Sequence, residues 1–312
     1  RAAYAAMART APNVMVADGT VPRSQLPSAL RKVQDLLKQH NLQANLLFHA
    51  GDGNFHPHLV FDERNPHHTQ YLSRILKQIL QICLEEGGTI SGEHGIGVEK
   101  RSMMAQQYDK KTLSLFAELK QAIDPDNLAN PLKIIPVNFS EKSAPSSILS
   151  DEILKLSETL QHARGPLLIA GKHCLQKTIP GVATVSTQAL NRLEEIDLTN
   201  YTLTAQAGIS LSQVGKALAE HAVYSCLPPG GGTLGGAFAS GCYPDFYKYI
   251  TGIEALLPDG TFVKYGGKLT KNAAGYNLIR LFAGSQGKFG IVTQLTLLTF
   301  SKVCTKSSTE NP

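Results

Sequence analysis

Apolar and polar positions in the first 140 residues alternate between two periods, that of a half-buried strand and that of an amphipathic helix. Leucine and valine positions after Pro27 recur every three or four residues, which predicts a helix that ends near residue 41. A longer apolar stripe begins at Pro66, and the pair Gly87-Gly88 ends it. Strands are expected at 13–17, 44–48 and 55–61, and helices at about 28–41, 66–86 and 110–123.

Two turn signals connect these elements. The first strand is expected to end at Asp18-Gly19, because glycine readily takes a positive φ. The sequence GDGN at 51–54 predicts that the second and third strands form a hairpin.

The pattern is interrupted at residues 137–150, where serine, proline and charge replace any apolar period. We interpret this stretch as a linker between a first domain at 1–136 and a second at 151–312. The second domain is expected to contain helices at 151–162 and 211–220, strands at 166–170 and 202–209, a hairpin at 250–267 and a final strand before residue 300.

Composition narrows the class of protein. A chain of 312 residues is long enough for two domains, and no apolar run is long enough to cross a bilayer. The net charge of +5 is spread without a dense basic stripe, so nucleic-acid binding is not expected. Five widely spaced cysteines without a CxxC pair predict reduced thiols and a cytoplasmic location. The opening RAAYAAMAR resembles the middle of an element, so we expect a fragment of a longer product.

A candidate metal site arises from two separated motifs. His49 and His56 flank the GDGN turn, and Glu93 and His94 follow in SGEHGIG, where glycines allow a close backbone approach. Imidazole and carboxylate ligands suit Zn²⁺, Mn²⁺ or Fe²⁺, and three protein ligands leave a coordination position open. The alternative is that these side chains only make structural hydrogen bonds in turns. The remaining histidines nearby are interpreted as surface or strand residues: His58, His67 and His68.

The glycine-rich loop at 228–241, PPGGGTLGGAFASG, is the main candidate site of the second half. Successive backbone N–H groups at these glycines, followed by a helix start, would suit a pyrophosphate. The loop is neither a P-loop nor a Rossmann fingerprint, because GKS/T and the acidic partner are missing. The alternative is a flexible surface turn.

The first half resembles a known family. HAGDGNFHP, GGTISGEHGIGVEKR and AIDPDNLANPLK are similar to the C-terminal cap domain of FAD-linked 2-hydroxy acid oxidoreductases, as in the D subunit of bacterial glycolate oxidases. The resemblance covers nearly all of residues 1–136 and implies a ferredoxin-like α+β fragment. By position it implies that His49, His56 and Glu93 are the ligands of a divalent metal. It also implies that His94 is the catalytic base and that the amide of Asn54 orients the site.

The second half resembles the FAD-binding domain of the vanillyl-alcohol oxidase (PCMH) type, as in the E subunit of the same oxidases. The motifs that carry this resemblance are GGTLGG, LPDG and GSQGKFGIVT, over about residues 148–300. It implies an α+β domain that binds FAD through three groups of residues: Gly171, Lys172, His173 and Cys174; Pro229, Gly230, Gly231, Gly232, Thr233, Leu234, Gly235, Gly236, Ser240 and Gly241; Gly287, Ile291 and Val292.

Together these resemblances imply oxidation of a small 2-hydroxy acid, glycolate first and D-lactate next, with hydride transfer to FAD. They also imply an iron–sulfur partner and a further flavoprotein subunit, with peripheral membrane association through these partners. Because a cap segment precedes the flavin domain here, the metal site could face a flavin other than the one that follows it. The alternatives are a non-catalytic flavoprotein or assembly subunit and a metal-dependent hydrolase.

Overall fold

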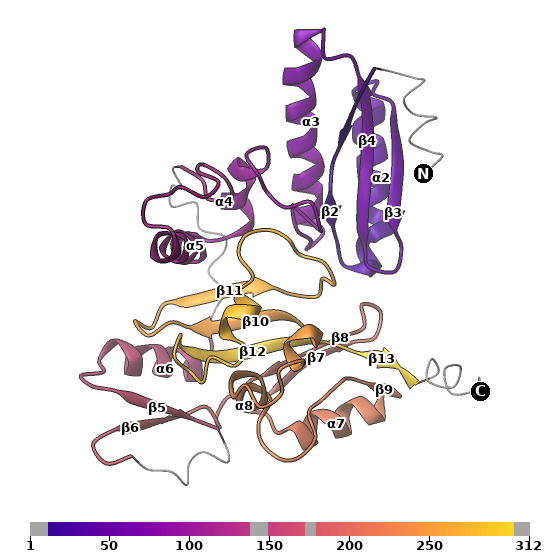
Figure 1. Ribbon diagram of the computed structural model, residues 1–312. Helices are drawn as coiled ribbons and strands as arrows, with labels where there is room; N and C mark the ends of the chain where they lie inside the picture. Colours follow the sequence, from indigo (N-terminus) through magenta and orange to yellow (C-terminus); the bar gives the residue numbers. More distant parts are fainter. Residues whose placement is uncertain (1–11, 138–148, 172–178, 303–312) are drawn as a thin grey trace, which may run out of the picture. The chain divides into compact units, whose positions relative to one another are not determined.

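The computed structural model describes residues 12–137, 149–171 and 179–302. The chain divides into two compact units. Unit 1 comprises Arg1–Pro145 together with Leu269–Tyr276, and unit 2 comprises Ser146–Lys268 and Asn277–Pro312. The segment Leu269–Tyr276, which we call the connector, thus belongs to unit 1 although it lies late in the sequence (Figure 1).

Unit 1 is built around an antiparallel sheet. Its elements are β1 (Asn13–Val16), β2 (Gly19–Thr20), η1 (Arg23–Gln25), α2 (Leu26–Gln39), β3 (Ala44–His49), β4 (Asn54–Phe61), α3 (Pro66–Glu85), η2 (Arg101–Met103), α4 (Met104–Gln107) and α5 (Lys110–Ile123). β3 pairs with one edge of β4, while β1 and β2 pair in succession along the other edge. An isolated bridge joins Thr20 to Thr89. This order of strands and helices is that of a ferredoxin-like fold whose fourth strand is reduced to the bridge.

The core of unit 1 follows from the apolar stripes of the two long helices. The buried residues of α2 recur at helical spacing, and those of α3 form a second stripe of the same kind. Phe55 and Leu59 of β4 are fully buried with them. α5 is capped by Asp109, whose side chain accepts a hydrogen bond from the N–H of Thr112 at 2.8 Å.

Unit 2 contains a second antiparallel sheet of the order β11-β10-β12-β8-β7. Its elements are α6 (Asp151–Gln161), β5 (Leu167–Ala170), β6 (Ala183–Ser186), β7 (Leu193–Asp197), β8 (Thr202–Gln206), α7 (Leu211–Glu220), β9 (Val223–Tyr224), α8 (Leu234–Ala239), η4 (Phe246–Tyr249), β10 (Ile250–Leu256), β11 (Phe262–Gly266), α9 (Leu278–Phe282), β12 (Ile291–Leu298) and β13 (Phe300–Ser301). β5 and β6 form a separate parallel pair.

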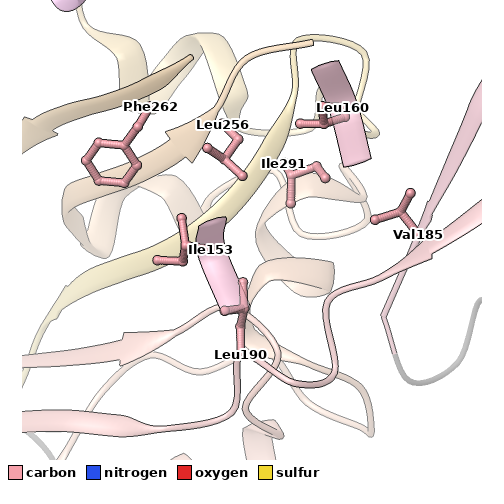
Figure 2. Close-up of a cluster of buried hydrophobic side chains, with 7 residues drawn as sticks. All are labelled: Ile153, Leu160, Val185, Leu190, Leu256, Phe262 and Ile291. Carbon is pink, nitrogen blue, oxygen red and sulfur yellow. The ribbon is translucent and has the colours of Figure 1, made fainter. Parts of the chain in front are cut away.

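A hydrophobic cluster joins α6 and β6 to the large sheet of unit 2 (Figure 2). Its buried members are Ile153, Leu160, Val185, Leu190, Leu256, Phe262 and Ile291. The cluster therefore fixes the β5–β6 pair beside the sheet, since Leu167 and Ile169 of β5 pack against the same residues.

The α+β class expected from the sequence is confirmed, and one local expectation is wrong. Gly19 does not have a positive φ: it lies in β2 opposite Phe55, and a side chain there would overlap the Sγ of Cys83. His58, expected on the surface or in a strand, lies in β4 and is fully buried there, with its Nδ1 2.8 Å from the carbonyl oxygen of His56. Most of the expected linker, residues 138–148, lies outside the described residues. No described helix has the length and apolar character required to cross a membrane.

Candidate functional site

The β3–β4 hairpin brings the two candidate histidines together. His49 is the last residue of β3 and is paired in register with Asn54, while His56 lies two residues further along β4. Their rings meet edge to face with centroids 5.4 Å apart. The hairpin that the GDGN turn predicts is therefore what makes two residues seven apart in sequence converge.

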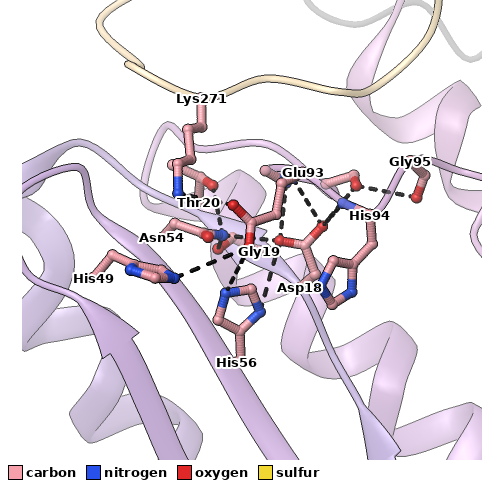
Figure 3. A network of polar contacts seen from close by, with 12 residues as sticks. Asp18, Gly19, Thr20, His49, Asn54, His56, Glu93, His94, Gly95 and Lys271 are labelled. Atoms are coloured by element: carbon pink, nitrogen blue, oxygen red, sulfur yellow. Dashed lines mark hydrogen bonds and ion pairs between the residues drawn. The ribbon is translucent and has the colours of Figure 1, made fainter.

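The turn that follows the Thr20–Thr89 bridge brings Glu93 and His94 to the same place (Figure 3). Glu93 Oε1 lies 3.3 Å from His56 Nε2 and 4.0 Å from His49 Nε2. One possible ligand atom from each of these three residues lies within 4.8 Å of the other two. The His94 ring stacks on His56, with centroids 5.1 Å apart and 20° between the planes. The site thus combines two imidazoles and a carboxylate with a third, exposed imidazole beside them.

The side chain of Asp18 holds the turn formed by residues 91–94. Its fully buried carboxylate accepts hydrogen bonds from the backbone N–H groups of Gly92, Glu93 and His94 at 3.2, 3.1 and 2.9 Å. The hydroxyl of Ser91 donates to the same carboxylate at 2.8 Å. Four consecutive residues of SGEH therefore converge on one side chain, which is contributed by the segment between β1 and β2.

The electrostatics of the buried side of the site depend on Asp18 and Lys100. Burial by itself raises the pKa of Asp18, but the Lys100 charge and the hydrogen bonds from His94, Asn54 and Ser91 outweigh it and hold the pKa well below its usual range. Lys100 Nζ donates to the Asp18 carbonyl at 2.9 Å, and its own pKa is lowered by burial. Burial also lowers the pKa of His56, which favours the neutral imidazole required of a metal ligand.

Asn54 faces Asp18 and β2. Its Nδ2 lies 2.8 Å from Asp18 Oδ1, 2.9 Å from the Gly19 carbonyl oxygen and 3.1 Å from Thr20 Oγ1. The amide therefore ties β4 to the segment that carries Asp18. Its Oδ1 is buried and has no hydrogen-bond partner within the described part of the chain.

The connector supplies a cation on the exposed side. Lys271 Nζ lies 2.8 Å from Glu93 Oε2 and 3.0 Å from Asp52 Oδ2. The hydrogen bond from Lys271 lowers the pKa of Glu93, and the same contact raises the pKa of Lys271. One carboxylate oxygen of Glu93 is thus held by the ammonium, while the other faces the two imidazoles.

The connector is attached to unit 1 along its length. The N–H of Ala273 donates to the Ser91 carbonyl at 2.9 Å, and the Tyr108 hydroxyl donates to the Ala274 carbonyl at 2.7 Å. Gly275 lies against the ring of Phe116, whose other neighbours include Tyr276 at a centroid distance of 5.8 Å. Lys271 is therefore carried by a segment that hydrogen-bonds to and packs on other parts of unit 1.

The expected close approach of glycine backbone is confirmed at one of three positions in GEHGIG. A Cβ at Gly92 would overlap Thr20 Oγ1 and Asn54 Nδ2. A Cβ at Gly95 or Gly97 would meet nothing within 4 Å, and these two residues instead have positive φ values of 80° and 55°.

In unit 2 the structure brings three of the expected FAD-binding residues close to β5: Gly171, Thr233 and Gly287. Gly171, which follows β5, faces Thr233, since a Cβ there would lie 2.7 Å from Thr233 Oγ1. Gly287 approaches Ile169 of β5 in the same way, at 2.8 Å. Ser240 and Gly241 follow α8, and Gly241 packs against Gly284. Three of the first-loop residues lie outside the described residues: Lys172, His173 and Cys174.

The glycine loop is only partly available to an anion. The N–H groups of Leu234 and Gly235 donate to the Ile209 and Ala207 carbonyls, and that of Gly236 is capped by Thr233 Oγ1. The preceding stretch, Pro229 through Gly232, is exposed or half-buried, and Gly230 and Gly232 have positive φ values of 96° and 117°. Available donors are thus confined to the first part of the loop. Ile291 and Val292 lie in β12, and the Ile291 side chain faces the hydrophobic cluster rather than the loop.

Four site residues were not found by sequence reasoning: Asp18, Ser91, Lys100 and Lys271. Asp18 had the sequence context of a turn, and Lys271 stands in no motif that the sequence analysis singled out. A buried carboxylate is identifiable only once its donors are known, and those in the turn at residues 91–94 lie more than 70 residues away along the chain.

Comparison with known proteins gives a separate match for each half of the chain. Residues 1–134 match the family model described as FAD linked oxidases, C-terminal domain, and residues 151–266 match that of an FAD binding domain. Glycolate oxidase subunit GlcD of Escherichia coli (strain K12) is 42% identical over 134 residues, which cover 43% of this chain and 27% of GlcD. D-lactate dehydrogenase of Archaeoglobus fulgidus is 25% identical over 215 residues, which cover 66% of this chain and 47% of that protein.

Among solved structures, an alkyldihydroxyacetonephosphate synthase aligns with a TM-score of 0.38 and 20% identity, over 47% of this chain and 31% of that one. The chain spans about a quarter of the length of GlcD and about half that of the archaeal dehydrogenase. The two halves of the chain thus match different domains: residues 1–134 match the C-terminal domain of FAD linked oxidases, and residues 151–266 match an FAD binding domain.

Proposed function

We propose that this chain is a component of an FAD-linked dehydrogenase that oxidises a small 2-hydroxy acid to the 2-oxo acid, with glycolate the preferred substrate and D-lactate the next. One observation carries the proposal. Possible ligand atoms of His49, His56 and Glu93 converge within 4.8 Å, with the His94 imidazole stacked beside them, in a chain that also carries an FAD-binding domain.

The residues of the triad fit a divalent metal of the zinc, manganese or iron type. Two imidazole nitrogens and one carboxylate oxygen form a donor set that such ions accept. His56 offers Nε2 on the side of Glu93, and burial favours its neutral form. Its Nδ1 is buried without a hydrogen-bond partner in the described part of the chain, and Asp18 Oδ1 lies 4.0 Å from it.

The unit 2 glycines fit a diphosphate in part. Gly230 and Gly232 have backbone conformations that L side chains rarely adopt, and their exposed stretch lies directly before Thr233, which faces Gly171. Backbone N–H groups in such a stretch can turn toward an anion. We propose that the diphosphate of FAD lies here, against the residues that follow β5.

When bound, the metal would polarise the substrate hydroxyl and the flavin would accept hydride. In this chain His49, His56 and Glu93 would fix the orientation of the 2-hydroxy acid, so that its hydroxyl faces His94. The His94 imidazole would take the hydroxyl proton and, being exposed, would release it to water. Asp18 would keep the backbone of residues 92–94 in place throughout, through the hydrogen bonds described above.

The names of the relatives support the substrate class. The similar proteins are a glycolate oxidase subunit and a D-lactate dehydrogenase, both of which are named for small 2-hydroxy acids. Because GlcD is a subunit, we propose assembly with a further flavoprotein subunit and an iron–sulfur subunit that receives the electrons. Any attachment to the inner face of the cytoplasmic membrane would then occur through these partners.

The place of the connector in unit 1 favours a catalytic role for this chain over a purely structural role. A residue between β11 and α9, in the half of the chain that carries the FAD-binding domain, contacts the proposed metal ligand Glu93. A non-catalytic assembly subunit would need no such contact. A metal-dependent hydrolase would need no FAD-binding domain, so the match over 151–266 argues against it.

The test is anaerobic single-turnover reduction by glycolate, after the absorbance spectrum and metal content of the purified protein have been measured. We expect bound flavin, about one metal per chain and loss of the oxidised flavin band on addition of glycolate. His94→Ala should keep both flavin and metal but leave the flavin oxidised, while His221→Ala, an exposed histidine after α7, should behave as wild type. Wild-type protein that contains both groups and is reduced by neither glycolate nor D-lactate would refute the proposal.

A further inference from the structure

Asp18 is a buried carboxylate to which the proposed function gives one role, that of holding the backbone of residues 92–94. It is fully buried between β1 and β2, and it accepts hydrogen bonds from three consecutive backbone N–H groups of the turn that carries Glu93 and His94. A carboxylate with this many donors cannot shift without breaking several of them. The position of the Glu93 and His94 backbones is therefore set by a single side chain.

The same carboxylate lies near His56, the buried member of the triad. Asp18 Oδ1 lies 4.0 Å from His56 Nδ1, and this nitrogen is the one buried ring atom that has no hydrogen-bond partner in the described part of the site. His56 Nε2 points to Glu93. A histidine that ligates a metal through one nitrogen commonly donates its other N–H to a carboxylate, which fixes its tautomer and orientation.

From these contacts we infer that Asp18 is a positioning residue for the metal site. It orients His56 through Nδ1, and it fixes Glu93 and His94 through their backbone N–H groups. Lys100 balances its charge, with Nζ 3.4 Å from Asp18 Oδ2. The pair belongs to the site rather than to the general core, because its other contacts are with Ser91, Gly92 and Asn54. The inference rests on the proposed metal site.

The experiment measures zinc affinity of the purified, metal-stripped protein by competition with a chromophoric chelator. Removal of an outer carboxylate that orients a metal ligand typically weakens metal binding by about 10- to 100-fold. We expect a loss of that size for Asp18→Asn, which keeps the volume but replaces an acceptor with a donor facing the N–H groups of the turn. Asp35→Asn, on the exposed face of α2, is the matched control and should bind zinc as wild type does.

Two further measurements separate positioning from a general effect on folding. In zinc-loaded wild-type protein labelled with ¹⁵N-histidine, the His56 Nδ1–H should give a downfield proton resonance that is protected from exchange, and Asp18→Asn should lose it. The cobalt-substituted protein should change its visible d–d spectrum in Asp18→Asn, because the ligand geometry is altered. The FAD content of unit 2 should be the same in the wild-type protein and in Asp18→Asn.

The outcomes decide between the two proposals. If the wild-type protein binds no zinc, the proposed metal site is wrong. If it binds zinc and a folded Asp18→Asn variant binds within twofold of wild type with the His56 resonance intact, the inference about Asp18 is wrong and the metal site stands. Should Asp18→Asn fail to fold, Ser91→Ala and Lys100→Met decide the question, since unchanged zinc affinity in both would overturn the inference.

Discussion

Side chains are excluded from residue 92 by two buried groups that are themselves fixed. Thr20 and Asn54 are both fully buried, and Asn54 is hydrogen-bonded to Asp18, so neither can yield to a methyl group at residue 92 without moving the Asp18 network. Gly95 and Gly97 lie a few residues away but are glycine for a different reason, their positive φ. Glycine at residue 92 is therefore a packing requirement of the site.

Gly92→Ala is expected to destabilise unit 1 by about 1–3 kcal/mol, the usual cost of overpacking a well-packed interior. It should also weaken metal binding, because the added methyl group displaces the turn that carries Glu93. The measurements are the denaturant midpoint and zinc affinity. Gly51→Ala is the matched control, since that glycine has no positive φ and a Cβ there meets nothing within 4 Å. Equal stability and affinity in the two variants would show that the turn tolerates the methyl group.

The convergence of the four candidate residues was predictable from sequence, and the residues that hold them in place were not. His49, His56, Glu93 and His94 stand in glycine-rich motifs, and the hairpin that unites the two histidines follows from the GDGN turn. Asp18 looked like a turn residue because local sequence cannot reveal donors that arrive from residues 91–94. The same limit applies to Gly19, whose need for glycine comes from Cys83 on α3 rather than from its own backbone.

At the scale of elements, the segments with a clear apolar period formed the expected helices and strands. The role of the connector, which has no such period, could not be predicted. The apolar stripes of α2, α3 and α7 and the alternation of β4 and β10 all give elements near the expected bounds, because burial of one face enforces the period. The connector has no period. Its place in unit 1 depends on single contacts, with Ser91, Tyr108 and Phe116, that no local pattern encodes.

Gly275→Ala should detach the connector from unit 1. Gly275 has a φ of 82°, and a Cβ there would lie 2.5 Å from the Phe116 ring, which is itself fully buried and cannot retreat. We expect faster hydrogen exchange at the Ala273 amide, which donates to Ser91, with little change in the β8–β12 ladder of unit 2. Hydrogen-exchange mass spectrometry of peptides covering 269–276 measures this.

The control for that experiment is Gly165→Ala, which lies before β5 at a glycine without positive φ and with open space around its Cβ position. It should leave the exchange of the connector unchanged. Exchange in Gly275→Ala that equals the wild-type rate would mean that the connector is held by its polar contacts alone, and that packing on Phe116 is dispensable.

At the scale of the whole molecule, the division into units does not follow the order of the sequence. The chain leaves unit 2 after Lys268, contributes the connector to unit 1 and returns to unit 2 at Asn277. A residue of the connector contacts a proposed ligand of the metal site. Metal binding at that site is therefore expected to affect the connector, whose two ends are covalently joined to β11 and α9.

Metal binding gives the sharpest test of this arrangement. A ligand that binds only the folded state at 100 times its dissociation constant stabilises that state by about 2.7 kcal/mol. Zinc added to metal-free protein should therefore slow exchange of unit 1 amides and, with them, that of the connector at Ala273, while the β8–β12 ladder exchanges as before. His56→Ala should abolish the protection in both unit 1 and the connector. Zinc-dependent protection of unit 1 without protection of the connector would show that the connector opens independently of the site, and Lys271 would then have no part in holding Glu93.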